Sequence, residues 1–332
     1  MRSELINTFS RLALDPKTTL LDRLVDFADS PDIQQAILMA LCAYEPAVLK
    51  DISVSYLEPA IVELMKSNRD VGVHHAARLL LRRSGISVTD DLAPASDPVI
   101  EPENDWFTNV AGQTMNHIHK LWIASTETTN SLLDEFTGGS GDLKDSAAAT
   151  RINFYRVAEF CNALSAKAGL PEDQWCYLPN EENQYAAGMK LKKNFQFLSG
   201  YRILTSQEWA KACQSGSKSP WFCGNDRSHL EKYMNITSSE KDSVVTGQLL
   251  PNRWGLFDMS GNALEWSMHI TEDLKNDLTI DKNTPFRLVG GSHRLNSENA
   301  MSINTLDTNP IPSKGLLLDC GFRVVRKFPD NE

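Results

Sequence analysis

Residues 87–104 divide this chain into two parts whose residue patterns differ. The stretch SVTDDLAPASDPVIEPEN combines prolines, acids and small polar residues without a helical period, which is typical of an exposed linker. Because 332 residues exceed the roughly 100–200 residues of a usual domain, the sequence predicts two folded units. We expect a helical-repeat segment over residues 1–86, a linker over 87–104, a second domain over 105–328 and a tail over 329–332.

Apolar residues before the linker recur at the spacing of amphipathic helices. Prolines interrupt this pattern at Pro16, Pro31, Pro46 and Pro59, and the first turn of a helix tolerates proline. These breaks predict four or five short helices joined by tight turns, as in HEAT-like helical hairpins.

The last of these helices is expected between Asp70 as N-cap and Gly85 as C-cap. It contains the adjacent pair His74 and His75. Neighbouring helical positions point about 100° apart, so the two rings cannot easily bind one metal ion. We therefore expect surface or packing histidines.

The charge of the chain argues against a nucleic-acid partner. The formal net charge is −10, and the sequence contains no basic stripe of the kind that binds phosphates. The pair Arg82 and Arg83 is short and flanked by apolar residues, so we expect a solvated helix face there.

The N-terminal residues and the cysteines indicate a cytoplasmic protein. The start MRSELINTFSRLALDPKT lacks the apolar run of a secretory signal, and no later window is apolar enough to span a bilayer. The six cysteines have neither metal-ligand nor disulfide-framework spacing. We therefore expect no membrane association and reduced, mostly buried thiols.

After the linker, two segments show convincing helical spacing. One covers residues 151–168, and the other begins at Thr205. Thr205 and Glu208 have the spacing of a capping box. Residues 138–149 are rich in Gly, Ser and Asp, which favours a loop.

Several motifs of the second part, taken in order, resemble the family of formylglycine-generating enzymes and sulfatase-modifying factors. They are ASTETTNSLLDEF at 124–136, AEFCNALS at 158–165, GYRILTSQEWAKAC at 200–213, PNRWGLFDMSGNALEW at 251–266, FRLVGGS at 286–292 and GFRVVRKF at 321–328. The resemblance implies an α+β domain of the C-type-lectin-like fold with little regular secondary structure. The chain is similar to a planctomycete-type bacterial version, in which a short helical-repeat segment precedes that domain.

In active members of that family, two cysteines after the GGS motif bind copper and activate oxygen. Aligning this motif places Leu295 and Ala300 at the two positions, and residues 293–304 contain no cysteine. Because Cu(I) favours soft sulfur ligands, the sequence predicts a pseudoenzyme that binds no copper and has no catalytic residues.

The resemblance also implies a calcium site in the turn before a WEW-like strand. The family's ligands there are a side-chain oxygen, two main-chain carbonyls and a glutamate, which correspond to Asp258, Gly261, Ala263 and Glu265. Such oxygen-only ligation suits Ca²⁺. The alternative is that Asp258 and Glu265 only cap turns.

These patterns favour a non-catalytic protein-binding scaffold or regulatory accessory subunit, whose partner is another protein. The company that such bacterial fusions keep suggests a signalling or antiphage defence system. Expected contact surfaces are the helical-repeat face and the segment 293–318, whose framing strands are kept while its loop is free to serve recognition. The residues expected to bind are His293, Arg294, Leu295, Met301, Ile303 and Leu306.

Two other functions remain open. An enzyme could use a different residue set in the same cleft, namely His293, Arg294 and Glu298. The domain could also be a ligand-recognition receptor of the C-type-lectin-like type, although the region lacks the Asn-rich repetitiveness of variable receptors.

Overall fold

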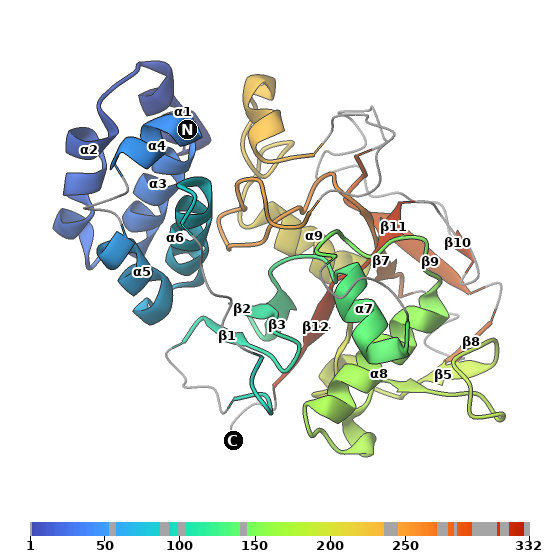
Figure 1. Cartoon of the computed structure of the whole chain (residues 1–332). Helices are drawn as coiled ribbons and strands as arrows, with labels where there is room; N and C mark the ends of the chain where they lie inside the picture. Colours follow the sequence, from blue (N-terminus) through green and yellow to red (C-terminus); the bar gives the residue numbers. More distant parts are fainter. Residues whose placement is uncertain are drawn as a thin grey trace.

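A computed structural model of the chain shows a helical segment beside a larger domain of helices and small sheets (Figure 1). This arrangement confirms the predicted fold class, an all-α segment followed by an α+β domain. The structure describes residues 2–52, 58–86, 93–98, 104–139, 145–235, 245–270, 278–281, 284–293, 311–312 and 319–328.

The helical segment consists of short helices whose starts follow the prolines. They are α1 (Arg2–Arg11), α2 (Pro16–Thr19), α3 (Pro31–Cys42), α4 (Pro46–Ile52), α5 (Glu58–Ser67) and α6 (Val71–Arg83), with the single turns η1 (Leu21–Arg23) and η2 (Val25–Phe27) before α3. Proline suits the first helical position because the N–H that it lacks would have no helical partner there. Among the described helices, none is both long enough and apolar enough to cross a membrane.

Helix α6 lies where the helical segment meets the second domain (Figure 1). Asp70 accepts a hydrogen bond from the main-chain N–H of Val73, which confirms the predicted N-cap. The helix ends at its cap residue Ser84, one residue before the predicted Gly85, which follows at φ +77°. Helices α3 and α5 pack against α6 and bury its apolar face.

The second domain is built around an antiparallel sheet with the strand order β1-β2-β3-β12-β6. The strands are β1 (Trp106–Thr108), β2 (Thr114–Ile118), β3 (Leu121–Ala124), β6 (Arg202–Ile203) and β12 (Val324–Arg326). Strand β12 lies between β3 and β6, where Val325 is opposite Ile123 and Val324 is opposite Ile203. Segments far apart in the sequence therefore form the centre of this sheet.

Two smaller sheets complete the domain. One has the order β10-β9-β7-β11 and the other the order β4-β5-β8. Their strands are β4 (Tyr177–Leu178), β5 (Met189–Leu191), β7 (Leu264–Met268), β8 (Thr279–Ile280), β9 (Pro285–Val289), β10 (Ile311–Pro312) and β11 (Cys320–Gly321). Strand β11 runs parallel to β7, and it places Gly321 opposite Glu265.

The helices of this domain begin at capping side chains. They are α7 (Asn130–Thr137), α8 (Phe154–Lys167) and α9 (Ser206–Gln214), and the short turns η4 (Glu172–Gln174), η5 (Phe195–Phe197) and η6 (Arg227–Lys232) accompany them. Helix α8 confirms the helix predicted over 151–168. The predicted capping box is also confirmed, because Thr205 and Glu208 each accept a hydrogen bond from the other's main-chain N–H, at 3.2 and 2.8 Å.

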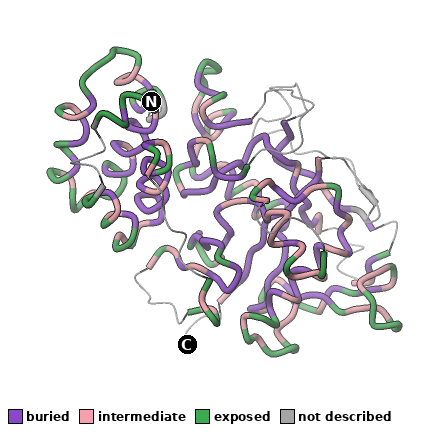
Figure 2. The backbone as a smooth tube through the Cα atoms, in the orientation of Figure 1, coloured by how far each residue is buried: buried purple, intermediate pink, exposed green. Residues whose placement is uncertain are grey.

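The helical segment and the second domain share a hydrophobic core (Figure 2). Residues of α3 and α6 pack there with Trp221, Leu250 and Phe257 of the domain. His74 stacks on Trp106 with ring centroids 3.8 Å apart, and His75 Nε2 lies 3.1 Å from the side-chain oxygen of Asn116. Both histidines are therefore packing residues, which is one of the two roles expected from the sequence.

Candidate functional site

Arg323 lies at the centre of a buried polar cluster that includes residues of the segment WGLFDMSGNALEW at 254–266. It follows β11 and is 1% exposed. Its guanidinium donates to both carboxylate oxygens of Glu265, with a shortest distance of 2.6 Å, and to the main-chain oxygens of Ala124, Ser125 and Phe257. One side chain thereby joins the end of β3, strand β7 and the loop that contains Phe257.

The contacts of Glu265 do not fit a calcium ion. Arg323 occupies both of its oxygens, and the indole N–H of Trp209 also donates to Oε2 at 3.0 Å. Asp258 Oδ2 accepts a hydrogen bond from the main-chain N–H of Gly247 at 2.6 Å. A guanidinium thus supplies the positive charge that a cation would bring, so calcium binding at Asp258, Gly261, Ala263 and Glu265 stays a prediction that the described donors do not support.

Glu127 brings a further carboxyl group to this cluster. It is 0% exposed, and Oε1 accepts from the side chain of Asn262 at 3.1 Å and from the main-chain N–H of Ala263 at 3.4 Å. Burial, together with the negative charge of Asp258, raises the pKa of Glu127 well above its ordinary value, and Arg323 opposes this only in part. Glu127 also shares a side-chain hydrogen bond with Asp258, so two buried carboxyl groups lie side by side in this cluster.

We expect the free energy of unfolding of the parent protein to fall as pH rises, and we expect this fall to be smaller in the variant Glu127→Gln. Because the folded-state pKa of Glu127 is raised, the folded state holds a proton that the unfolded state releases above about pH 4.3. The free energy of unfolding of the parent then falls toward the raised pKa, by up to about 1.4 kcal/mol per pH unit. The uncharged variant lacks this contribution, so its stability curve is flatter.

Urea denaturation of both proteins at several values between about pH 5 and pH 8 measures this difference. Glu135→Gln is the control, because Glu135 lies on the surface, where its side chain is 49% exposed. Equal slopes for the parent and Glu127→Gln would show that Glu127 is ionised in the folded protein.

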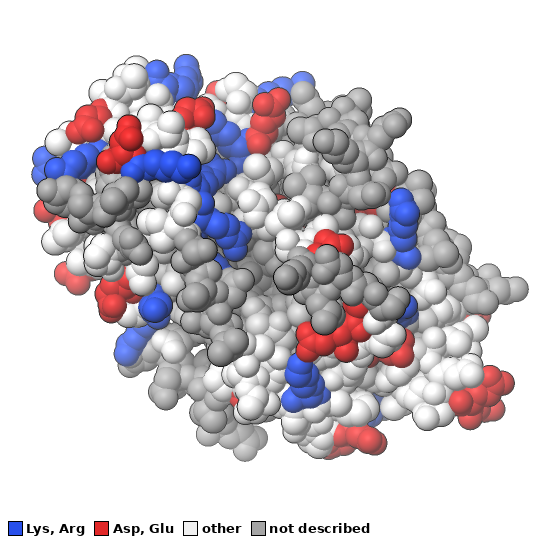
Figure 3. Space-filling view, in the orientation of Figure 1, with Lys and Arg blue, Asp and Glu red and all other residues white. Residues whose placement is uncertain are grey.

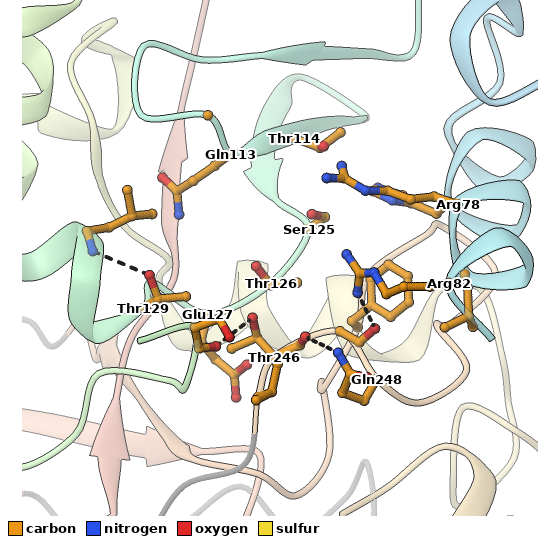
Figure 4. A pocket seen from close by; sticks show the side chains of 18 of the residues that line it. Arg78, Arg82, Gln113, Thr114, Ser125, Thr126, Glu127, Thr129, Thr246 and Gln248 are labelled. Carbon is orange, nitrogen blue, oxygen red and sulfur yellow. Dashed lines mark hydrogen bonds between the residues drawn. The ribbon is translucent and has the colours of Figure 1, made fainter. Parts of the chain in front are cut away.

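A cavity of about 630 Å³ lies between α6 and the second domain (Figure 4). Glu127 lines it from the domain side, and Arg78 and Arg82 project into it from α6. Seven further polar side chains also line it. They are Gln113, Thr114, Ser125, Thr126, Thr129, Thr246 and Gln248.

The residues expected to bind a partner do not form a described surface. His293 is 1% exposed, and its Nδ1 lies 2.7 Å from the main-chain oxygen of Asn262, so it is placed inside the domain. The turn after β9 folds its ring against the 258–265 segment, and a binding role of His293 stays a prediction. Arg294, Leu295, Met301, Ile303 and Leu306 lie outside the described residues, as do Glu298 and Ala300.

All six cysteines are buried free thiols, as the sequence predicts. Burial raises the pKa of Cys42, Cys213 and Cys223 to about 12 and that of Cys176 to about 11. Within the described part of the chain, no group of three or more His, Cys, Asp or Glu side chains could hold a metal ion. These thiols therefore fit a structural role, since a thiol must ionise before it ligates copper.

Sequence reasoning missed three residues of this region: Glu127, Arg323 and Arg82. Glu127 and Arg323 lie in the motifs at 124–136 and 321–328, which were used only to identify the family. Arg82 was interpreted as part of a solvated face, and it is exposed; the sequence did not show that its guanidinium also lines the cavity and donates to the main-chain oxygen of Gly247 at 3.3 Å. The signal in the sequence that could have pointed to this role was the pair Arg82 and Arg83 at the end of a largely apolar helix.

Comparisons with known proteins agree with the geometry of the second domain. The family model of the sulfatase-modifying factor enzyme 1-like domain matches residues 100–328. Chaperone protein LppX of Paenibacillus barcinonensis is 26% identical over 209 residues, which are 56% of this chain and 72% of that protein.

One solved structure shares the fold, and a second shows a weaker similarity. Treponema denticola variable protein 1 has a TM-score of 0.50 at 23% identity, and the match covers 63% of this chain and 84% of that one. PvdO from Pseudomonas aeruginosa has a TM-score of 0.45 at 18% identity, covering 63% of this chain and 80% of that one. At these identities the likeness to variable protein 1 concerns the fold alone.

Proposed function

Because this chain belongs to the sulfatase-modifying factor enzyme 1-like family through residues 100–328, we propose that it is a member without oxidase chemistry that acts as a protein-binding scaffold or regulatory subunit. The observation that carries this proposal is the lack of a thiol pair after the GGS motif. Residues 293–304 contain no cysteine, and Leu295 and Ala300 stand at the expected ligand positions. The side chains of leucine and alanine contain no sulfur, nitrogen or oxygen atom and therefore cannot ligate copper.

Cys320 does not restore the missing pair. It is the one cysteine of the sequence between residues 293 and 332, and it is 0% exposed in strand β11. Burial raises the pKa of its thiol well above the ordinary value, and the neighbouring Asp319 raises it further. A single neutral thiol in a strand supports a structural role.

A binding role is supported by the surface of the helical segment and by one relative. Large apolar side chains lie exposed there, including Leu12 at 62% and Val25 at 81%. Among the described residues, six of the nine large apolar side chains that are exposed belong to this segment, and contiguous apolar patches are typical of protein contact surfaces. The relative LppX carries the name of a chaperone protein, which is in keeping with a partner that is itself a protein.

The proposal predicts binding without turnover. With copper, reductant and a sulfatase-type cysteine peptide, we expect no aldehyde above the level of a mixture without enzyme. Used as bait in extracts of its native host, the same protein is expected to retain a protein partner. Replacing Val25 and Leu12 with Asp should abolish this capture without lowering the melting temperature, because both side chains are exposed.

Phe197→Asp is the matched control, since Phe197 is 70% exposed but lies on the second domain. An active formylglycine-generating enzyme added to the same peptide mixture shows that the assay detects aldehyde. Aldehyde formation by this protein would contradict the non-catalytic half of the proposal. Full capture by the Val25 and Leu12 double variant would show that the helical segment is not the contact surface.

A further inference from the structure

The wall of the cavity between α6 and the second domain contains a group of hydroxyl side chains. Thr114 and Ser125 line it and are only 5% and 6% exposed, and Thr126 lines it beside Ser125. Each hydroxyl can both donate and accept a hydrogen bond. The wall therefore offers several hydrogen-bonding groups to a molecule in the cavity.

Arg82 adds a positive charge to this wall. Among the described residues it donates to one acceptor, the main-chain oxygen of Gly247, at 3.3 Å, and no carboxylate lies within ion-pair distance of it. Partial desolvation lowers the pKa of Arg82 without any opposing carboxylate, although a guanidinium remains charged at neutral pH. The planar guanidinium of Arg82 can contact two oxygens of a carboxylate or phosphate anion in a bidentate way.

Arg78 lies one helical turn before Arg82, on the same face of α6. Both side chains extend from the helix toward Ser125 and Thr126 (Figure 4). The two guanidinium groups and the hydroxyl wall therefore converge on one space. Across that space lies Glu127, and burial raises the pKa of this carboxyl group above its ordinary value, which favours the neutral form.

The surface around the cavity agrees with an anionic ligand. Although the chain carries a net charge of −10, Lys and Arg side chains form a run along the helical segment where it borders the second domain (Figure 3). Such a local field attracts anions despite the opposite overall charge. A volume of about 630 Å³ lies within the range of small-molecule sites, about 300–1,000 Å³.

We propose that this cavity binds a small organic oxyanion, whose phosphate or carboxylate group contacts Arg82 and Arg78 and whose remaining polar atoms contact the hydroxyls of Thr114, Ser125 and Thr126. The site lies between α6 and the family domain, so it uses both parts of the chain. It does not depend on the proposed protein partner. A ligand held there stabilises the docking of α6, because it binds residues of both parts.

Isothermal titration calorimetry at constant ionic strength tests the proposal with four probes: inorganic phosphate, pyrophosphate, acetate and glutarate. We expect saturable binding of at least one probe below about 10 mM, and the probe that binds shows whether a phosphate or a carboxylate is preferred. Arg82→Gln should weaken binding about tenfold or more, since a hydrogen bond to a charged group is lost. Thr126→Asp should abolish binding because it places a negative charge in the cavity.

Arg23→Gln is the matched control, because Arg23 is an exposed arginine of the same segment that pairs with Asp26. It should bind the probe as the parent does, within about twofold. Thermal unfolding without probe identifies any variant that fails to fold. If Arg82→Gln fails to fold, Thr126→Asp still tests the proposal. Lack of saturable binding of all four probes overturns the proposal, as does unchanged affinity in the folded cavity variants.

Discussion

Gly261→Ala is expected to destabilise the protein by about 2–5 kcal/mol. Gly261 has φ +85°, where an L side chain is strained, and a Cβ at this position would lie 2.4 Å from the main-chain oxygen of Asn235. The main-chain N–H of Gly261 donates to the main-chain oxygen of Gly290 at 2.8 Å, so this turn joins two loops of the domain. The main-chain oxygen of Asn235 accepts from the N–H of Asn262 at 3.2 Å, and moving it away from a new Cβ would break this hydrogen bond.

Urea denaturation of parent and variant measures the effect as a lower midpoint at unchanged slope. Gly169→Ala is the matched control: its φ is +76°, but a Cβ there would meet nothing within 4 Å. It should cost only about 1–2 kcal/mol, which is the penalty of the left-handed conformation alone. Equal losses for the two variants would show that the contact with Asn235 does not limit this turn.

Arg323→Met is expected to destabilise the protein by about 3–5 kcal/mol, because it leaves a buried carboxylate without its counter-charge. Arg323 and Glu265 are both 1% exposed. The variant also leaves the carbonyls of Ala124, Ser125 and Phe257 without the donor that they have now. Methionine keeps much of the side-chain volume, so the loss reports charge and hydrogen bonding more than a cavity.

Arg253→Met provides the comparison at an exposed ion pair. Arg253 binds Asp32 at 2.8 Å, with side chains 55% and 67% exposed, and such pairs are worth at most about 1 kcal/mol. The double variant Arg323→Met with Glu265→Gln should recover part of the lost stability, since it removes the unpaired charge. A loss below about 1 kcal/mol for Arg323→Met would contradict the central role of this ion pair.

Local signals in the sequence predicted the helices well. Proline at α2, α3 and α4, the N-cap at Asp70 and the capping box at Thr205 act within one turn of helix, so neighbouring residues determine them. The ordered motifs identified the family and with it the fold of the second domain. The spacing of apolar residues did not predict helix α7, because its eight residues give too short a periodic pattern.

The site depends on contacts between distant residues, and a single sequence does not contain that information. Glu265 was predicted as a calcium ligand, which stays a prediction, and its ion pair with Arg323, 58 residues later, was not foreseen. Arg82 was assigned to a solvated face because its neighbours in the sequence are apolar; its wall partners come from β2 and the residues after β3. The partners of these charged side chains are therefore known only from the folded structure.

The central position of strand β12 has a consequence for the order of folding during synthesis. Ribosomes deliver β3 and β6 long before β12, so the two strands must wait for Val324 and Val325 to fill the gap between them. Until then each presents an unpaired edge, which is a template for association with other chains. Closing so long a loop is also slow. The nascent domain is therefore expected to need protection from aggregation until its C-terminal residues leave the exit tunnel.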